Sequence, residues 1–135
     1  MKLIDTNVFI YAIGGDHPYR EACRKVLRAG TSNAMEATTD VEVCQELLHH
    51  YHSIRMTQRA AQVVAEALAA FPDAISITVP VISRAAKILE ANPPLQARDA
   101  VHAAVVFEHG LEGIVSADVG FDGIEGLTRF DPRQF

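Results

Sequence analysis

The sequence predicts an α/β protein: a mostly parallel central sheet of about four to five strands, flanked by helices on both faces. Short apolar segments that resemble strands alternate along the chain with longer helical patterns, which is typical of this class. Hydrophobic residues make up 49% of the 135 positions, enough for one buried core. The chain is too short for two domains of ordinary size, so we expect residues 1–135 to form a single domain.

The expected strands are short and mostly apolar. The first belongs to the opening segment MKLIDTNVFIYA, whose apolar residues indicate burial although Asp5, Thr6 and Asn7 interrupt them. An unpaired buried carboxylate is costly, so Asp5 should be hydrogen-bonded, paired or bound to a cation. The predicted strands are residues 2–5, 34–38, 75–79, 113–117 and 127–130.

Helix signals occupy the intervals between these strands. Residues 18–30 begin with a proline and end at a glycine, the usual asymmetry of helix ends. Residues 40–53 follow TTD, a good N-cap region, and residues 57–71 are rich in alanine. Pro80 begins the next helix, which ends before Asn92, and residues 97–109 form the last long one.

Composition excludes several classes of protein. The net charge of −5 argues against a broad basic face that would hold duplex nucleic acid. The two cysteines suggest neither a disulfide framework nor a zinc site, and reduced thiols indicate a cytoplasmic protein. No apolar run approaches the length of a membrane helix, and we expect the opening segment to belong to the fold rather than to a signal peptide.

Acidic residues recur where strands end or helices begin. Asp5 ends the first strand, Asp99 begins the last long helix, and Asp118 follows GIVSA, with Asp122 four residues later. Glu46 adds a charge to the largely apolar stretch VCQELL. Active sites of parallel sheets lie beyond the carboxyl ends of the strands, so these side chains are expected to converge there.

Converging carboxylates repel one another, and a divalent cation would relieve this repulsion. Oxygen ligands without cysteine or a clear histidine partner favour Mg²⁺ or Mn²⁺, which suit phosphodiester chemistry. Spacing alone leaves a second interpretation open, because aspartates that only cap helices at positions 99 and 118 would give the same pattern.

Four ordered segments carry a family resemblance: IDTNVFIYA, QELLHHY, RDAVHAAVVFEHGLEGIVSADVGFDGI and LTRFDP. Together they resemble the PIN-domain ribonucleases, most closely the VapC toxins of bacterial toxin–antitoxin pairs. The resemblance runs from residue 4 to residue 132, and each motif is loose by itself. It implies a Rossmann-like, mostly parallel sheet that holds three or four acids around one or two Mg²⁺ or Mn²⁺ ions.

The resemblance also implies roles for individual residues. Asp5, Glu46, Asp99 and Asp118 match the four acidic motifs, with Asp5, Asp99 and Asp118 as metal ligands and Glu46 acting on the attacking water. The resemblance further implies hydrolysis of RNA to a 5′-phosphate and a 3′-hydroxyl. Three residues are expected to support this set: Thr6, Asn7 and Asp122.

Arg98 and His102 leave alternatives open. Arg98 precedes Asp99 and would contact an RNA phosphate or form an ion pair. His102 lies one helical turn after Asp99, so it would contact substrate or be packed behind the site. Glu42 shares a helical face with Glu46 but is expected in the first helical turn, where the helix dipole favours an acid.

Other histidines and basic residues carry weaker signals. The histidines at 49, 50 and 52 are expected to be solvated or interfacial, because no further ligand has suitable spacing. Arginines on helices are usually solvated surface, although some could bind the RNA backbone. The candidates are Arg20, Arg24, Lys25, Arg28, Arg55 and Arg59. The apolar face around Val63, Val64, Leu68 and Phe71 could be core, dimer contact or antitoxin groove.

The expected partners follow from the resemblance: RNA as substrate, a VapB-type antitoxin whose C-terminal segment covers the acidic pocket, and a second copy in a homodimer. A PIN nuclease of RNA processing or repair is an alternative. From another class, a non-catalytic acidic α/β signalling or binding module is possible. A phosphoacceptor receiver would need a late lysine, and the last lysine here is Lys87.

Overall fold

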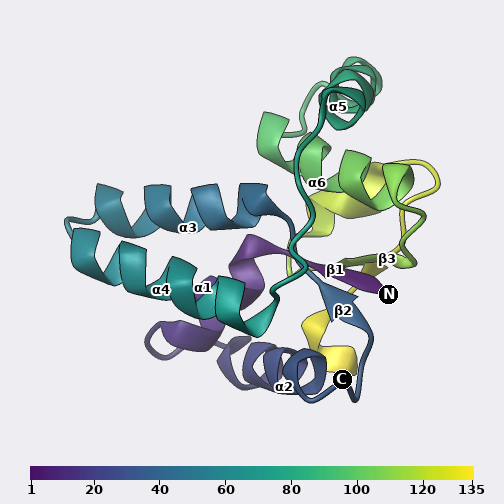
Figure 1. The fold of residues 1–135 in the computed structure, drawn as a ribbon. Coiled ribbons are helices and arrows are strands. Elements are labelled where there is room, and N and C mark those ends of the chain that lie inside the picture. The colour runs from purple at the N-terminus through teal and green to yellow at the C-terminus, as the bar shows by residue number, and fades with distance from the viewer.

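Four parallel strands form the centre of the protein, described for residues 1–135 by a computed structural model. Their order in the sheet is β2-β1-β3-β4, and helices lie on both sides of it (Figure 1). This arrangement confirms the predicted α/β class. The strands are β1 (Lys2–Ile4), β2 (Ala37–Thr38), β3 (Gly113–Val115) and β4 (Arg129–Phe130).

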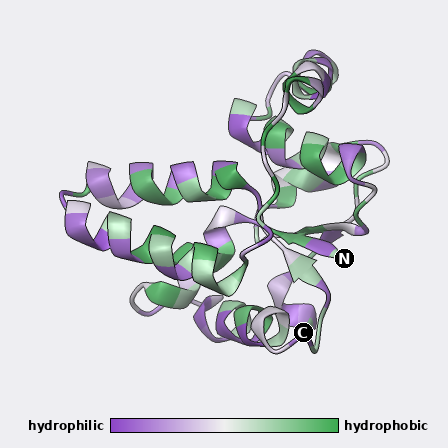
Figure 2. Ribbon diagram, viewed as in Figure 1, coloured by the Kyte–Doolittle hydropathy of each residue, from purple (hydrophilic) through white to green (hydrophobic).

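Six helices surround the sheet. α3 and α4 pack side by side and extend away from the strands (Figure 1), and in Figure 2 both alternate between hydrophilic and hydrophobic residues, as amphipathic helices do. The helices are α1 (Thr6–Ile13), α2 (Arg20–Thr31), α3 (Val41–Ser53), α4 (Thr57–Ala70), α5 (Val79–Ala91) and α6 (Ala97–Glu108). Two short 3₁₀ helices are η1 (Val119–Gly123) and η2 (Pro132–Gln134). None of the helices has the length and apolar character needed to span a membrane.

Alternation along the two central strands produces two separate cores. Leu3 and Ile114 pair across the sheet and pack with residues of α5 and α6. Their neighbours Ile4 and Val115 point to the opposite face and pack with residues of α1, α2, α3 and α4. All four side chains are completely buried, as expected for parallel strands covered on both faces.

Aspartates begin the elements that follow all four strands; after β4, Asp131 caps η2 by accepting from the Arg133 N–H. Asp5 follows β1 directly and caps α1, because its carboxylate accepts from the Thr6 N–H. Asp40 follows β2 and caps α3 through the Val43 N–H, and Asp118 follows β3 and caps η1. The capping preference of aspartate therefore brings four carboxylates to the carboxyl edge of the sheet.

Three predictions of secondary structure are corrected. The strand predicted at 75–79 is wrong, because Ile75 makes only an isolated bridge with Asp40 and α5 already begins at Val79. Pro80 has no N–H to donate to a neighbouring strand, but it fits the first turn of a helix. The other predicted strands are shorter than expected. The helix predicted from residue 18 begins at Arg20, two residues after the proline.

Helix α1 was not anticipated. The run VFIYA is apolar throughout and gave no clear helical period. In the structure Val8, Phe9 and Ala12 are buried, while Asn7 and Tyr11 lie on a more exposed face. The residues after Asp5 therefore turn sharply from strand into helix, which brings Asn7 back toward the carboxylate that begins it.

Candidate active site

A polar pocket of about 400 Å³ lies beyond the carboxyl ends of β1 and β3. The strand order β2-β1-β3-β4 places β2 on one side of β1 and β3 on the other, so the order of the strands reverses at this point of the sheet. Ligands of open α/β sheets bind at such a position. Most of the predicted site residues line it: Asp5, Thr6, Asn7, Glu46, Arg98, Asp99 and Asp118. A larger hollow of about 600 Å³ beside α5 and α6 contains none of them.

Asp5 is the most tightly held carboxylate of the pocket. Its Oδ1 accepts from the Thr6 N–H at 2.7 Å, and its Oδ2 accepts from Asn7 Nδ2 at 2.7 Å and from the Ser116 hydroxyl at 2.6 Å. The residue is 4% exposed. Burial raises its pKa, and the charge of His102 and the Ser116 hydrogen bond oppose that shift without cancelling it.

Ser116 joins the ends of the two central strands. Its hydroxyl oxygen accepts from Asn7 Nδ2 at 2.9 Å and from the Asp118 N–H at 3.0 Å. Asn7 Oδ1 in turn accepts from the Ala117 N–H at 3.3 Å. Sequence reasoning missed Ser116, although a small polar residue between an apolar strand and Asp118 was the available signal.

Asp99 and Asp118 approach the pocket from other elements. Asp99 lies in the first turn of α6, and its pKa is raised to about 6 by burial and by the negative charges of Asp5, Asp118 and Glu46. Asp118 is exposed, and its Oδ1 accepts from the Gly120 N–H at 2.8 Å. The negative charges of Asp5, Asp118 and Glu46 therefore add to the effect of burial at Asp99.

His102 is fully buried and connects two acids. Its Nδ1 lies 2.8 Å from Asp40 Oδ2, and its Nε2 lies 2.7 Å from Glu46 Oε1 and 3.8 Å from Asp5 Oδ1. Burial alone would lower the imidazole pKa, but the Asp40 charge and the hydrogen bonds to Asp40 and Glu46 hold it well above its usual value. This placement matches the packed alternative rather than a substrate contact.

Asp40 is a second residue that sequence reasoning missed. The TTD segment indicated a helix N-cap, and one oxygen of Asp40 does accept from the Val43 N–H at 2.9 Å. Its other oxygen reaches His102, 62 residues later in the chain, and no local pattern predicts that contact.

Arg98 and Asp122 lie at different distances from the pocket. Arg98 is on the rim with its Nε 3.8 Å from Glu46 Oε2, so an ion pair is present although the side chain is half-exposed. Asp122 does not line the pocket: its two oxygens accept from Arg129 at 2.7 and 3.1 Å. Arg129 also donates to the Ser116 carbonyl at 2.9 Å, so Asp122 is connected to the pocket only through Arg129 and Ser116.

The pocket's donors fit a hard cation, although no group of three or more histidine, cysteine, aspartate or glutamate side chains is arranged as a ready-made metal site. Asp5, Asp99 and Asp118 present only oxygen ligands, and the Thr6 hydroxyl beside them is buried without a hydrogen-bond partner. Mg²⁺ commonly keeps several waters and uses one or two carboxylates. The pocket therefore suits an ion held partly through water.

Comparisons with known proteins agree with this geometry. The family model described as PIN domain matches residues 2–127. Ribonuclease VapC13 of Mycobacterium tuberculosis is 30% identical over 129 residues, which cover 96% of this chain and 98% of that protein. The chain is a PIN-domain protein of the VapC family. Ribonuclease VapC7 of the same organism is 33% identical over 137 residues, covering 98% of this VapC-family chain and 92% of the relative.

Solved structures share the PIN fold along the whole chain. FitAcB from Neisseria gonorrhoeae superposes with a TM-score of 0.75 at 19% identity and covers 100% of both chains. A toxin–antitoxin complex from Klebsiella pneumoniae gives 0.69 at 21% identity and covers 98% of both chains. VapBC2 from Rickettsia felis, bound to a promoter DNA fragment, gives 0.73 at 14% identity and covers 96% of each. At these identities the likeness concerns the fold alone.

Proposed function

We propose that this VapC-family protein is an Mg²⁺- or Mn²⁺-dependent endoribonuclease and acts as the toxin of a toxin–antitoxin pair. The observation that carries the proposal is the convergence of Asp5, Glu46, Asp99 and Asp118 in one pocket at the carboxyl edge of the sheet. The ribonuclease names of relatives that match nearly the whole chain support the same activity.

Asp5, Asp99 and Asp118 would hold the divalent ion, directly or through water. When bound, the ion supplies positive charge that stabilises the phosphate in the transition state and makes the attacking water a better nucleophile. Asp5 needs no movement for this role, because Asn7 and Ser116 already fix its side chain. Asp99 and Asp118 are less constrained and would adjust to the ion.

Glu46 would orient and deprotonate the attacking water. Its carboxylate lines the pocket from α3, and the hydrogen bond to His102 together with the Arg98 guanidinium restrains a side chain that is otherwise flexible. In hydrolysis, water oxygen bonds to phosphorus as the bond from phosphorus to the 3′-oxygen breaks. The leaving oxygen gains a proton, which gives a 3′-hydroxyl and a 5′-phosphate.

The toxin role requires a protein that blocks the pocket. An antitoxin segment carrying an arginine would satisfy the carboxylates of Asp5, Asp99 and Asp118 in place of a cation. The solved complexes of similar fold are described as a toxin–antitoxin complex and as VapBC2, which supports such a partner. A homodimer and a cytoplasmic location are further parts of the proposal; the free Cys23 and Cys44 suit a reducing compartment.

The apolar face of α4, which the sequence left open, divides between core and surface. Val63 and Phe71 are buried against α1 and α2, so they belong to the core. Leu68 is 41% exposed and is the residue of this face that remains accessible to another chain.

Cleavage of a panel of structured and single-stranded RNAs tests the enzymatic proposal. We expect purified protein to cut with Mg²⁺ or Mn²⁺, to stop with EDTA, and to lose activity by about 100-fold or more in Asp5→Asn and Glu46→Gln. Asp73→Asn, at an exposed aspartate remote from the pocket, is the matched control. Cutting that survives EDTA and Asp5→Asn would refute a metal-dependent site.

A growth experiment separates a toxin from a nuclease of RNA processing. Controlled expression should arrest growth for the wild type and not for Asp5→Asn, and co-expression of a small antitoxin encoded beside the gene should restore growth. Metal-dependent cutting without arrest would favour the processing alternative. Folded protein that binds a partner but cuts no RNA would favour a non-catalytic module.

A further inference from the structure

An ordered pair of aromatic rings borders the acidic pocket. Tyr11 of α1 lies one helical turn after Asn7, and both residues line the pocket. The His17 ring stacks on Tyr11 with centroids 3.9 Å apart and planes 9° apart. Asn7, which holds the Asp5 carboxylate, and Tyr11 are therefore about 6 Å apart along α1.

His17 is exposed, yet its ring is fixed in place. The Tyr19 N–H donates to His17 Nδ1 at 3.1 Å, which sets the ring orientation and leaves Nε2 free. Tyr19 is itself anchored, because its hydroxyl donates to Asp131 Oδ2 at 2.9 Å and the Arg133 guanidinium lies over its ring. An exposed ring held from both sides has already lost much of the side-chain entropy that binding would otherwise cost.

The stacked pair joins the acidic pocket to a second hollow. Tyr11 lines the pocket, and His17 lines an adjacent polar hollow of about 550 Å³ together with Arg20 and Arg24. Asp16 and Glu21 also line this hollow. Carboxylates, stacked rings and guanidinium groups thus follow one another along the surface.

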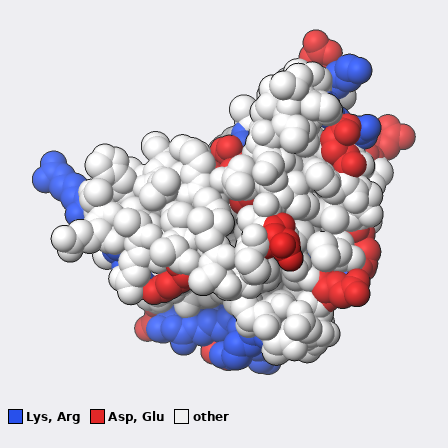
Figure 3. Space-filling model, viewed as in Figure 1, with Lys and Arg blue, Asp and Glu red and all other residues white.

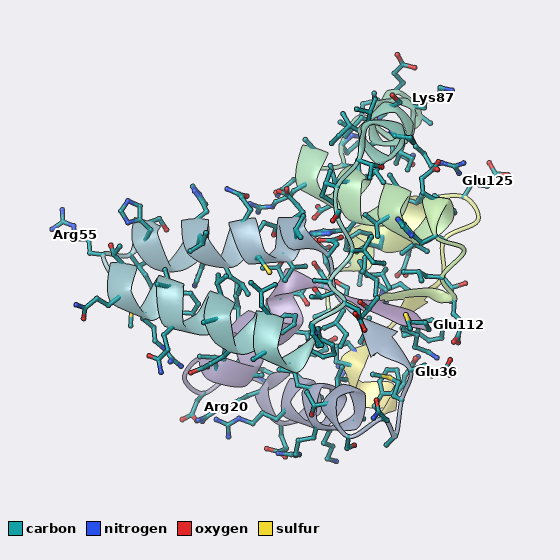
Figure 4. The ribbon with its side chains drawn as sticks, viewed as in Figure 1. Arg20, Glu36, Arg55, Lys87, Glu112 and Glu125 are labelled. Carbon is teal, nitrogen blue, oxygen red and sulfur yellow. The ribbon has the colours of Figure 1, made fainter.

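Helix α2 is basic in a chain that is acidic overall. Lysine and arginine side chains gather over α2 in Figure 3, and Figure 4 shows Arg20 at its start. Arg20 holds Asp16 at 3.2 Å through an exposed ion pair, and its buried Nε has no hydrogen-bond partner. Glu21 is engaged by Arg28 at 2.8 Å. Exposed pairs of this kind contribute little, so a phosphate could replace Asp16 at Arg20.

We propose that Tyr11 and His17 form a stacking subsite for an unpaired base of single-stranded RNA, with the adjoining phosphate near Arg20. The inference rests on the proposed ribonuclease function and specifies the substrate that the same site takes. Bases in single strands expose their faces for stacking on aromatic side chains, whereas bases in a duplex do not. Arg55, by contrast, lies at the far end of the α3 and α4 pair (Figure 4).

Binding measured by fluorescence anisotropy tests the subsite. The probes are a labelled 12-nucleotide single-stranded RNA of mixed sequence and its duplex, with the full chain in the Asp5→Asn background and Mg²⁺ present. His17→Ala is expected to weaken single-strand binding about 5- to 150-fold, the range measured for loss of one stacking contact. His17→Phe should restore most of it. His109→Ala, at an exposed histidine beyond the other end of α6, should change nothing.

The arginine part of the proposal has its own readout. Arg20→Gln should reduce the slope of log affinity against log salt by about 0.7, as expected when one phosphate contact of a single strand is lost. His17→Ala should leave that slope unchanged, because it removes the stacking ring and keeps the Arg20 guanidinium in place.

Several results would overturn the subsite. The first is that His17→Ala binds the single strand within twofold of the reference, or loses as much affinity for the duplex as for the single strand. The second is that His17→Phe does not restore binding. The third is that His17→Ala weakens binding of the antitoxin and not of RNA. Failure of the ribonuclease proposal is distinguishable, because then wild-type protein would cut no RNA with Mg²⁺ or Mn²⁺. Metal-dependent cutting with normal affinity in His17→Ala would refute only the stacking subsite.

Discussion

Replacement of Asp40 tests the buried connection behind Glu46. One Asp40 oxygen caps α3 and the other contacts His102, and both residues are completely buried. Loss of an N-cap costs about 1 kcal/mol, and removal of one partner from a buried ion pair costs about 3 to 5 kcal/mol. We therefore expect Asp40→Ala to lower the free energy of unfolding by about 4 to 6 kcal/mol. That is a large share of the 5 to 15 kcal/mol typical of a domain.

Asp40→Asn separates the charge from the hydrogen bonds. The amide oxygen can still accept from the Val43 N–H, and the amide N–H can donate to His102 Nδ1. A neutral imidazole can then keep its Nε2–H on Glu46. We expect Asp40→Asn to be less destabilising than Asp40→Ala by about 2 kcal/mol or more, because no buried group loses its partner.

The assay is urea unfolding followed by far-ultraviolet circular dichroism at pH 7, with His109→Ala as the surface control. Two outcomes would refute the reasoning. Asp40→Ala within about 1 kcal/mol of the wild type would show that the pair is not important for stability. Equal losses in Asp40→Ala and Asp40→Asn would show that the hydrogen bonds do not carry the effect.

Three further predictions concern other parts of the chain. Gly113 has φ near +155°, and a Cβ added there would meet a backbone carbonyl. Gly113→Ala should therefore lower the free energy of unfolding by about 2 kcal/mol or more. Gly123→Ala is the control and should change it little, because a Cβ at Gly123 meets open space. Hydrogen bonds from Lys2 and from the N-terminal amine lower the pKa of Glu112 to about 2, so its contribution to stability is present above pH 4.5 and is lost as pH falls toward 2. Glu112→Gln should flatten that part of the stability curve; an unchanged curve would contradict the assignment. Burial raises the pKa of the Cys23 thiol to about 12, so a thiol reagent at pH 8 should react with Cys23 at the rate of local opening and not on mixing.

The sequence allowed prediction of the fold class and of the residues that approach the pocket. Asp5 and Asp118 follow apolar strands and Asp99 begins a helix, so their positions at the sheet edge follow from local patterns. Asp122 is close to Asp118 in sequence, but the 3₁₀ turn directs it to Arg129, a contact that its spacing does not predict.

The contacts behind the pocket could not be predicted in this way. Ser116 reaches Asp5 across 111 residues, and His102 reaches Asp40 and Glu46 across 62 and 56. Such bonds depend on the register between β1 and β3 and on the packing of α6 against α3. Sequence spacing carries no information on either, so these residues appear in the sequence only as a serine, a helix cap and an isolated histidine.

These hidden contacts change how the charge of the pocket is balanced. Asp5 is the most buried of the site carboxylates, yet Thr6, Asn7 and Ser116 donate hydrogen bonds to it and His102 Nε2 lies 3.8 Å from its Oδ1. The less satisfied charges are those of Asp99 and Asp118, which lie toward solvent. Mg²⁺ is commonly bound by one or two carboxylates together with substrate phosphates, so an ion here would serve the RNA phosphate as well as these carboxylates. The firmly held Asp5 carboxylate thus lies behind the less constrained Asp99 and Asp118, and the stacked Tyr11 and His17 rings lie beside them to receive the base.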